Sequence, residues 1–282
     1  MKRIRNLSIF NAVSLLIHIS IAYLTQTRIF DNSTIGEISN KYPSLFIPAN
    51  ITFLIWSAIY AGLIAFCIYH LRMAHKAVAD HPANADAGKI GWLFIINNLA
   101  TAAWLIAWVK EQLLLSVLLI AVQMITLIII HIRLKIHDAH ASLASKTFTQ
   151  FPLSIYLGWI SIATIANLSS YLSAIHWSGW GVSDINWTIT MVLVTVLVTV
   201  GIINRRRNVF FGLTVIWGLY GILLKRSAID AEAYQPIIMV IWGSMAIISV
   251  SCLFGLARNL RKTIRKRRSD RNLQNSSRKM AE

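Results

Sequence analysis

The side chains that could perform acid–base or ion-coupled chemistry lie almost entirely outside the long apolar segments of this sequence. All 11 Asp and Glu residues fall in connecting segments, at the edges of apolar segments or near the C-terminus, and His18 is the ionisable side chain deep within one. Transporters driven by protons or sodium usually keep a carboxylate at membrane depth, and the hydrolase motifs HExxH and GxSxG do not occur here. The pattern argues against charge-driven chemistry. We expect a neutral, hydrogen-bonded His18, with a proton relay as the alternative.

Aromatic and amide side chains are what the apolar segments do contain. Four of the ten tryptophans have the positions of interface residues, whose indoles prefer the headgroup level: Trp92, Trp177, Trp180 and Trp187. The remaining candidates for function lie deeper: Trp56, Trp104, Trp108, Trp159, Asn97, Asn98 and Asn167. Because an amide in hydrocarbon needs a partner on another helix, each Asn is interpreted as a contact between helices or, alternatively, as a ligand contact.

The elements that must position these residues are membrane-spanning helices. Hydrophobic residues make up 56% of the 282 residues and charged residues 13%, with a mean hydropathy of +0.60, against roughly 25% charge in ordinary soluble domains. About 20 apolar residues cross a hydrocarbon core of about 30 Å. We therefore predict an all-α polytopic membrane protein with eight spans: 7–25, 51–71, 90–109, 112–132, 150–172, 187–203, 208–224 and 236–257.

The distribution of positive charge predicts the orientation of these spans. With the N-terminus in the cytoplasm, 22 of the 27 Lys and Arg residues face inward, as the positive-inside rule requires. Both termini are then cytoplasmic, and no cleavable signal peptide is expected. Residues 258–282 form a basic tail that is predicted to extend the last helix, to become disordered at its end, and to meet anionic lipid rather than nucleic acid. Cys67 and Cys252 are interpreted as core residues, without a disulfide or a metal site.

Three segments resemble the TspO/MBR family of tryptophan-rich sensory and translocator proteins. Residues 42–50 (YPSLFIPAN) and 53–60 (FLIWSAIY) are similar to the prolines and the WxxxY pattern at the start of that family's second helix. Residues 99–104 (LATAAW) are similar to the third-helix LALNxxW pattern, with Thr101 in place of its Asn. Residues 152–167 (PLSIYLGWISIATIAN) are similar to the fifth-helix PYLxWVxxAxxLN pattern. The resemblance covers residues 1–172.

This resemblance implies a fold, a ligand class and a site. The fold is a five-helix bundle that is commonly dimeric, with a pocket opening toward the loop after the first helix. Its ligands are porphyrins and other flat hydrophobic molecules, so a bound porphyrin or haem-type ligand is implied here, although no cofactor is required. The ligand-binding residues expected from it, together with neighbours on the same helices, are Pro48, Trp56, Tyr60, Asn98, Thr101, Trp104, Trp108, Trp159, Ala163 and Asn167.

The segment between the first two spans is predicted to be a lid, and the last three spans an addition. Residues 26–49 turn apolar between Pro43 and Pro48, and proline favours extended backbone, so we expect Leu45 and Phe46 to fold over the pocket mouth. Residues 173–257 carry three further spans with glycines suited to close packing.

The resulting hypothesis is a receptor, sensor or carrier for a flat hydrophobic ligand in a bacterial-type inner membrane, more consistent with a binding protein than with an enzyme. A secondary transporter of a neutral solute and a pigment-degrading enzyme are the alternatives.

Overall fold

The computed structural model describes residues 1–76, 81–136 and 141–281, with only the backbone given for residues 260–281. Every regular element in these ranges is helical. Seven helices are long and apolar enough to cross a membrane, and there are eight if one bent pair counts as a single span, so the prediction of an all-α polytopic membrane protein is confirmed. The long helices are α1 (Lys2–Gln26), α3 (Ile55–His75), α5 (Leu93–Val109), α6 (Leu113–Leu134), α8 (Phe151–Ala174), α9 (Asp184–Arg206), α10 (Val209–Asp230) and α11 (Gln235–Ala281).

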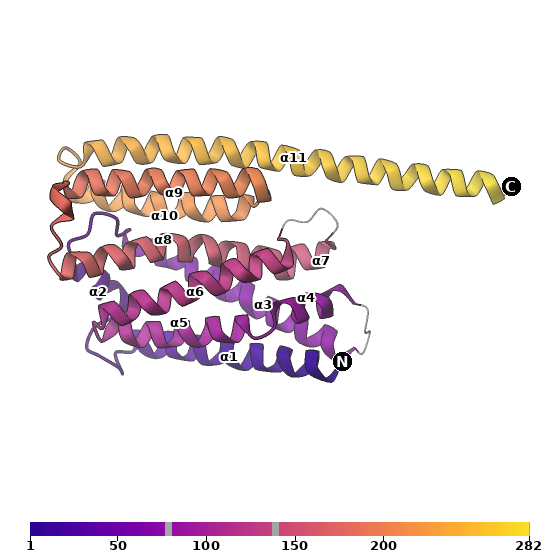
Figure 1. Cartoon of the computed structure of the whole chain (residues 1–282), viewed down its shortest axis with the longest axis horizontal. Helices are drawn as coiled ribbons and strands as arrows, with labels where there is room; N and C mark the ends of the chain where they lie inside the picture. Colours follow the sequence, from indigo (N-terminus) through magenta and orange to yellow (C-terminus); the bar gives the residue numbers. More distant parts are fainter. Residues whose placement is uncertain (77–80, 137–140, 282) are drawn as a thin grey trace.

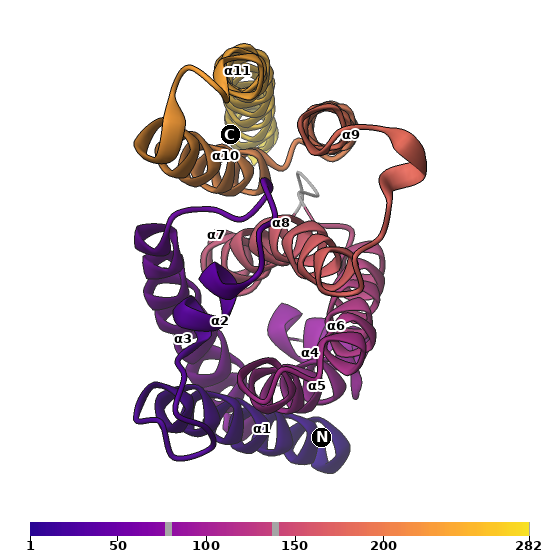
Figure 2. The ribbon, with the colours of Figure 1, turned by 90° about the vertical axis from the view of Figure 1, so that its left-hand side faces the viewer.

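The first five long helices form a ring. Helix α1 contacts α3 and α5, α5 contacts α6, α6 contacts α8, and α8 returns to α3, as Figure 2 shows from one end of the bundle. Both termini lie at the same end of the molecule, opposite the short helix α2 (Ile35–Lys41) (Figure 1). Both termini lie at one end because the chain crosses between the two ends of the bundle an even number of times.

The bent pair is α4 (Pro82–Ile90) and α5, which meet at an angle of 54°. Gly91 lies at the break with φ +55°, a left-handed conformation that a residue without a Cβ adopts at low cost. The sequence predicted a span over residues 90–109, which α5 matches, and left residues 82–89 in the preceding connection, so α4 is an additional helix that was not predicted.

Helices α9, α10 and α11 form a second layer outside the ring, and α10 joins this layer to α8 (Figure 1). Helix α10 approaches α8 closely because small residues line the contact: a Cβ on Gly158 would lie 2.8 Å from Thr214, and a Cβ on Gly218 would lie 2.8 Å from Ile162. Close approach through glycine is the usual way in which membrane helices gain packing contacts.

Two sequence predictions about the ends of elements were wrong. The segment 26–49 is not extended throughout, because α2 forms within it. Its N-terminus is closed by a capping box in which Glu37 N–H donates to Thr34 Oγ1 and Thr34 N–H donates to Glu37 Oε2. The tail does not become disordered after its basic run, since α11 continues as one helix to Ala281.

Four further short elements lie in the described connections before α3, before α8 and between α8 and α9. Residues Leu143–Ser145 (α7) and a wider π-helical turn, Lys146–Gln150, lead directly into α8. A 3₁₀ turn, Asn50–Leu54, leads into α3, and a second one, Gly179–Gly181, lies between α8 and α9. The turn Asn50–Leu54 matters for function, because it lies beside α2 and α10 at one end of the ring.

Candidate functional site

A cavity lies inside the ring at the end where α2 crosses it. The space open to the centre of a water molecule is about 40 Å³, which is room for about three waters. Its walls come from α3, α5 and α8, and its cover comes from α2 and the segment that precedes α3. The lining residues are Ile35, Ser39, Ile47, Pro48, Phe53, Trp56, Trp104, Trp108, Trp159, Ile162, Ala163, Ala166, Asn167 and Ser170.

The structure brings together most of the residues singled out from the sequence, and turns three of them elsewhere. Those that line the cavity are Pro48, Trp56, Trp104, Trp108, Trp159, Ala163 and Asn167. Tyr60, Asn98 and Thr101 do not line it, because their helices present them to neighbouring helices. The lining also includes residues that the sequence analysis did not name, chiefly the α2 residues Ile35 and Ser39.

Helix α8 supplies one continuous wall. Trp159, Ala163 and Asn167 follow one another at intervals of four residues, so they share one face of the helix. Phe53, from the turn before α3, packs edge-on against Trp159 with ring centroids 5.9 Å apart. Ala163 is the small residue between two larger ones on this face, and it leaves room where a larger side chain would fill the cavity.

Asn167 joins three helices at the cavity wall. The Trp104 indole N–H donates to Asn167 Oδ1 over 2.9 Å, and the Asn167 amide donates to Ser116 Oγ on α6 over 2.8 Å. Trp104 in turn stacks on Trp108 with an interplanar angle of 19°. Asn167 thus fixes the orientation of an indole that faces the cavity. It makes the predicted contact between helices, and its contact with a ligand stays a prediction.

A polar cluster lies behind Trp56, away from the cavity. Asn98 donates from its amide nitrogen to Ser14 Oγ, so its Oδ1, 3.1 Å from His18 Nδ1, must accept from that ring nitrogen. His18 Nε2 is therefore the acceptor that faces Tyr60 Oη at 3.5 Å. The Tyr60 ring stacks on Trp56 with centroids 5.2 Å apart. His18 is fully buried and hydrogen-bonded, as a neutral core histidine would be.

Thr101 has a similar structural position between helices. Its hydroxyl shares a hydrogen bond of 2.8 Å with Tyr156 Oη on α8 and also donates to the Asn97 carbonyl. The Tyr156 ring lies edge-on to Trp56, with centroids 5.9 Å apart. Thr101 and Tyr156 therefore lie behind Trp56 and do not line the cavity.

The cover of the cavity differs from the predicted lid. Phe46 is 1% exposed and belongs to the hydrophobic core, and Leu45 packs against that core, but neither lines the cavity. The residues that close it from above are Ile47 and Pro48 together with Ile35 and Ser39 of α2. Leu45 and Phe46 form a turn that packs into the hydrophobic core, so the next two residues, Ile47 and Pro48, are the ones that reach the cavity.

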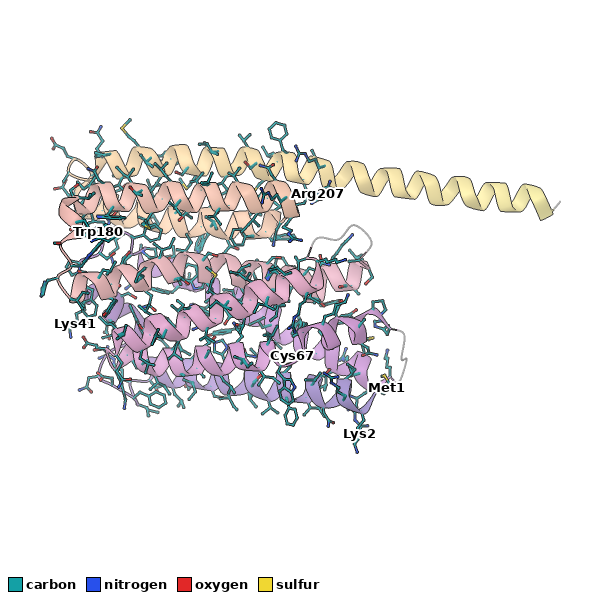
Figure 3. All side chains as sticks on the ribbon, in the orientation of Figure 1. Met1, Lys2, Lys41, Cys67, Trp180 and Arg207 are labelled. Carbon is teal, nitrogen blue, oxygen red and sulfur yellow. The ribbon has the colours of Figure 1, made fainter. Side chains whose placement is uncertain are left out.

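Helix α2 is held over the cavity by polar contacts to the α5–α6 turn. Glu111 in that turn accepts from Lys41 Nζ at 2.6 Å and from Tyr42 Oη at 2.5 Å. The contacts from Lys41 and Tyr42 lower the pKa of Glu111, while burial and Glu111 raise the pKa of Tyr42 to about 12. The Trp108 indole also donates to the Ile35 carbonyl over 3.2 Å. Figure 3 shows Lys41 at the end of the molecule opposite Met1 and Lys2.

The chemistry available at the cavity is apolar and aromatic. None of its lining residues is ionisable, and the described residues contain no group of three or more His, Cys, Asp or Glu that could hold a metal ion. Indole faces offer stacking surfaces, and Asn167, Ser39 and Ser170 offer a few neutral hydrogen-bonding groups. Such a composition suits a hydrophobic, largely aromatic part of a ligand.

Comparison with known proteins gives one family. The family model described as TSPO-like protein matches residues 8–254. The match extends beyond the five-helix ring and includes α9, α10 and the membrane part of α11, whereas the resemblance of individual motifs ended near residue 172. Searches of curated proteins and of solved structures gave no match.

Proposed function

The chain belongs to the TSPO-like protein family, and on this basis we propose that it binds a flat hydrophobic molecule of the porphyrin or tetrapyrrole class in the cavity under α2. Membership indicates a membrane protein of the sensing and binding kind; the ligand class is the further step. The observation that carries it is the cavity wall, which presents four indoles and no charge to one enclosed space.

The arrangement of the indoles supports a planar ligand. Trp104 and Trp108 stack nearly parallel on one side, and Trp159 lies on α8 with Phe53 against it. A conjugated ring inserted among them would gain stacking worth about 1–3 kcal/mol for each well-placed aromatic, by analogy with bases on aromatic side chains. The small side chain of Ala163 leaves space beside the Trp159 ring.

The cavity is too small for the proposed ligand unless its cover moves. Room for about three waters does not accommodate a tetrapyrrole, and ligand pockets generally measure several hundred Å³. Binding therefore requires α2 and the segment carrying Ile47 and Pro48 to move outward. The ion pair of Glu111 with Lys41 is exposed, and exposed ion pairs are weak, so the part-buried hydrogen bond from Tyr42 is the stronger of the two contacts that must break.

A binding protein is favoured over the secondary transporter. The named residues converge on a cavity at one end of the bundle. Deeper in the ring, the space behind Trp56 is occupied by hydrogen-bonded side chains, His18 and Tyr60 among them. A carrier would need that region to open as well.

Orientation and surroundings complete the proposal. The positive charge predicts that both termini face the cytoplasm of a bacterial-type cell and that α2 faces outward. Under this orientation, the basic tail lies beside anionic lipid on the inner leaflet. A homodimer remains the expectation from the family resemblance.

Quenching of tryptophan fluorescence tests the ligand class. Purified protein in detergent is titrated with protoporphyrin, haem, a sterol and a phospholipid in parallel. We expect saturable quenching by the tetrapyrroles and a dissociation constant about 5- to 150-fold weaker for Trp159→Ala, which corresponds to about 1–3 kcal/mol of lost stacking. Trp180→Ala, which changes an indole that is 79% exposed outside the cavity, is the matched control. Equal affinity in Trp159→Ala and wild type would refute the proposal.

A further inference from the structure

A buried guanidinium without a carboxylate partner lies in the second layer. Arg226 is 4% exposed, and its Nε has no hydrogen-bond partner among the described residues. The ion pairs of the described residues join Arg28 to Glu37, Lys41 to Glu111 and Lys89 to Asp86, so Arg226 belongs to none of them. An unpaired buried charge is costly, and this one lacks a counter-anion within the described chain.

The immediate neighbours of Arg226 are neutral or positively charged. Its guanidinium carbon lies 5.2 Å from the centre of the Tyr234 ring, and the Tyr234 side chain shares a hydrogen bond with it. Lys225, the preceding residue, donates to Asn40 Oδ1 over 2.7 Å. Asp230, one turn further along α10, accepts the backbone N–H groups of the following turn through Oδ1. Neither of these two adjacent positive charges therefore forms an ion pair with a carboxylate among the described residues.

The place of this pair in the fold favours a lipid over the ligand of the cavity. Arg226 continues the buried face of α10 that carries Leu219 and Ile222, whereas the cavity cover contacts another face of that helix, at Gly221. It lies four residues before the end of α10. A helix of 22 residues is about 33 Å long, so its end reaches the headgroup level of the bilayer.

Exposed apolar side chains at this end of α10 and α11 would suit acyl chains. Ile229 on α10 and Met239 on α11 are 59% and 65% exposed. A guanidinium offers up to five N–H donors in a geometry that matches phosphate oxygens, and an ammonium adds a second charge. We propose that Arg226 and Lys225 bind the phosphate group of a membrane phospholipid at the end of the bundle that carries α2.

This site is separate from both the proposed cavity ligand and the basic tail. Lys225 holds Asn40 in α2, whose neighbour Ser39 lines the cavity. A phospholipid that engages Lys225 would compete with Asn40 for its ammonium. Occupation of the phosphate site would then loosen one contact that keeps α2 over the cavity.

The test measures bound phospholipid and thermal unfolding on the same full-length samples. Delipidated protein in detergent is supplied with phosphatidylglycerol, and retained lipid is counted by native mass spectrometry. We expect Arg226→Gln to bind about 10- to 150-fold more weakly, the loss of one or more charged hydrogen bonds, and Arg226→Lys to retain part of the affinity. The control is Arg205→Gln, which removes an exposed positive charge in the last turn of α9, at the end of the bundle opposite Arg226. This variant should bind phospholipid as wild type does.

Stability without lipid supplies the second readout. Because the unpaired charge is costly, delipidated Arg226→Gln should unfold at the same temperature as wild type or higher, and added phospholipid should stabilise wild type alone. A delipidated Arg226→Gln that is less stable than wild type, with no effect of lipid on either protein, would show that Arg226 is paired within the chain and would overturn the proposal.

Two further arms identify the source of the anion. Equal stabilisation by inorganic phosphate would mean that the site takes a free anion, and this result would overturn the lipid assignment. Loss of porphyrin affinity in Arg226→Gln, with lipid retention unchanged, would assign the charge to a carboxylate of the cavity ligand and would also overturn it. Weaker porphyrin binding in Trp159→Ala alone concerns the cavity and leaves the phosphate site unaffected, so the two proposals fail separately.

Discussion

The hydrogen bonds of Asn167 give a prediction whose magnitude follows from the structure. Replacement by Leu keeps a side chain of similar size and removes the 2.9 Å bond from Trp104 and the 2.8 Å bond to Ser116. Side-chain hydrogen bonds between membrane helices contribute about 0.6 kcal/mol on average and up to about 1.7 kcal/mol. The variant also leaves the Trp104 indole N–H buried without a partner, at about 1–3 kcal/mol. We expect Asn167→Leu to lower the free energy of unfolding by about 2–4 kcal/mol.

A double-mutant cycle isolates the bond between the two residues. Trp104→Phe removes the indole donor, and the pair Asn167→Leu with Trp104→Phe should destabilise less than the sum of the single changes, by about 0.6–1.7 kcal/mol. Unfolding in mixed micelles is followed by circular dichroism, because one variant alters the fluorescence. Ser170→Ala is the control: its hydroxyl lines the same cavity but donates only within its own helix, so stability should change little. Strictly additive effects of the two changes would refute the assigned bond.

Three other predictions address the cover, the second layer and the orientation. The lowered pKa of the Glu111 carboxyl means that its contribution to stability is present above the ordinary value of 4.5 and is lost as pH falls through the folded-state pKa; the melting temperature of wild type should fall in that acidic range, and Glu111→Gln should lack this component. Gly221→Ala places a methyl group against Thr52 and should destabilise by about 1–3 kcal/mol, whereas a neutral result would contradict the close contact of α10. A reporter fused after residue 258 should score cytoplasmic and one within residues 173–186 extracytoplasmic, and an outward tail would contradict an even number of spans.

The membrane spans were predictable because each is a long apolar segment. The short helices depend on local signals, such as helix caps and glycines, that a hydropathy profile does not detect. Each predicted span overlaps a long helix. Helix α2 was missed although Thr34 and Glu37 have the spacing of a capping box, which is the signal that would have found it. Gly91 marked the break between α4 and α5, but a single glycine in an apolar run predicts a kink only weakly.

Which residues of one helix share a face was predictable from their spacing. Whether that face points to the cavity or to a neighbouring helix was not predictable. Trp159, Ala163 and Asn167 follow from intervals of four residues along α8. Tyr60 lies one turn after Trp56 on α3, yet it faces His18, because the direction of a helix face depends on how the neighbouring helix is rotated. That rotation is set by packing across the ring and cannot be derived from a single sequence.

The central claim, that the cavity under α2 is a ligand site, is tested most directly by Ala163→Phe. Porphyrin affinity and thermal unfolding in detergent are measured on the same preparation. A Phe ring at this position would fill the space beside Trp159, so the account predicts a folded protein whose porphyrin binding is abolished. A folded Ala163→Phe protein with the affinity of wild type would contradict the account and remove α8 from the site.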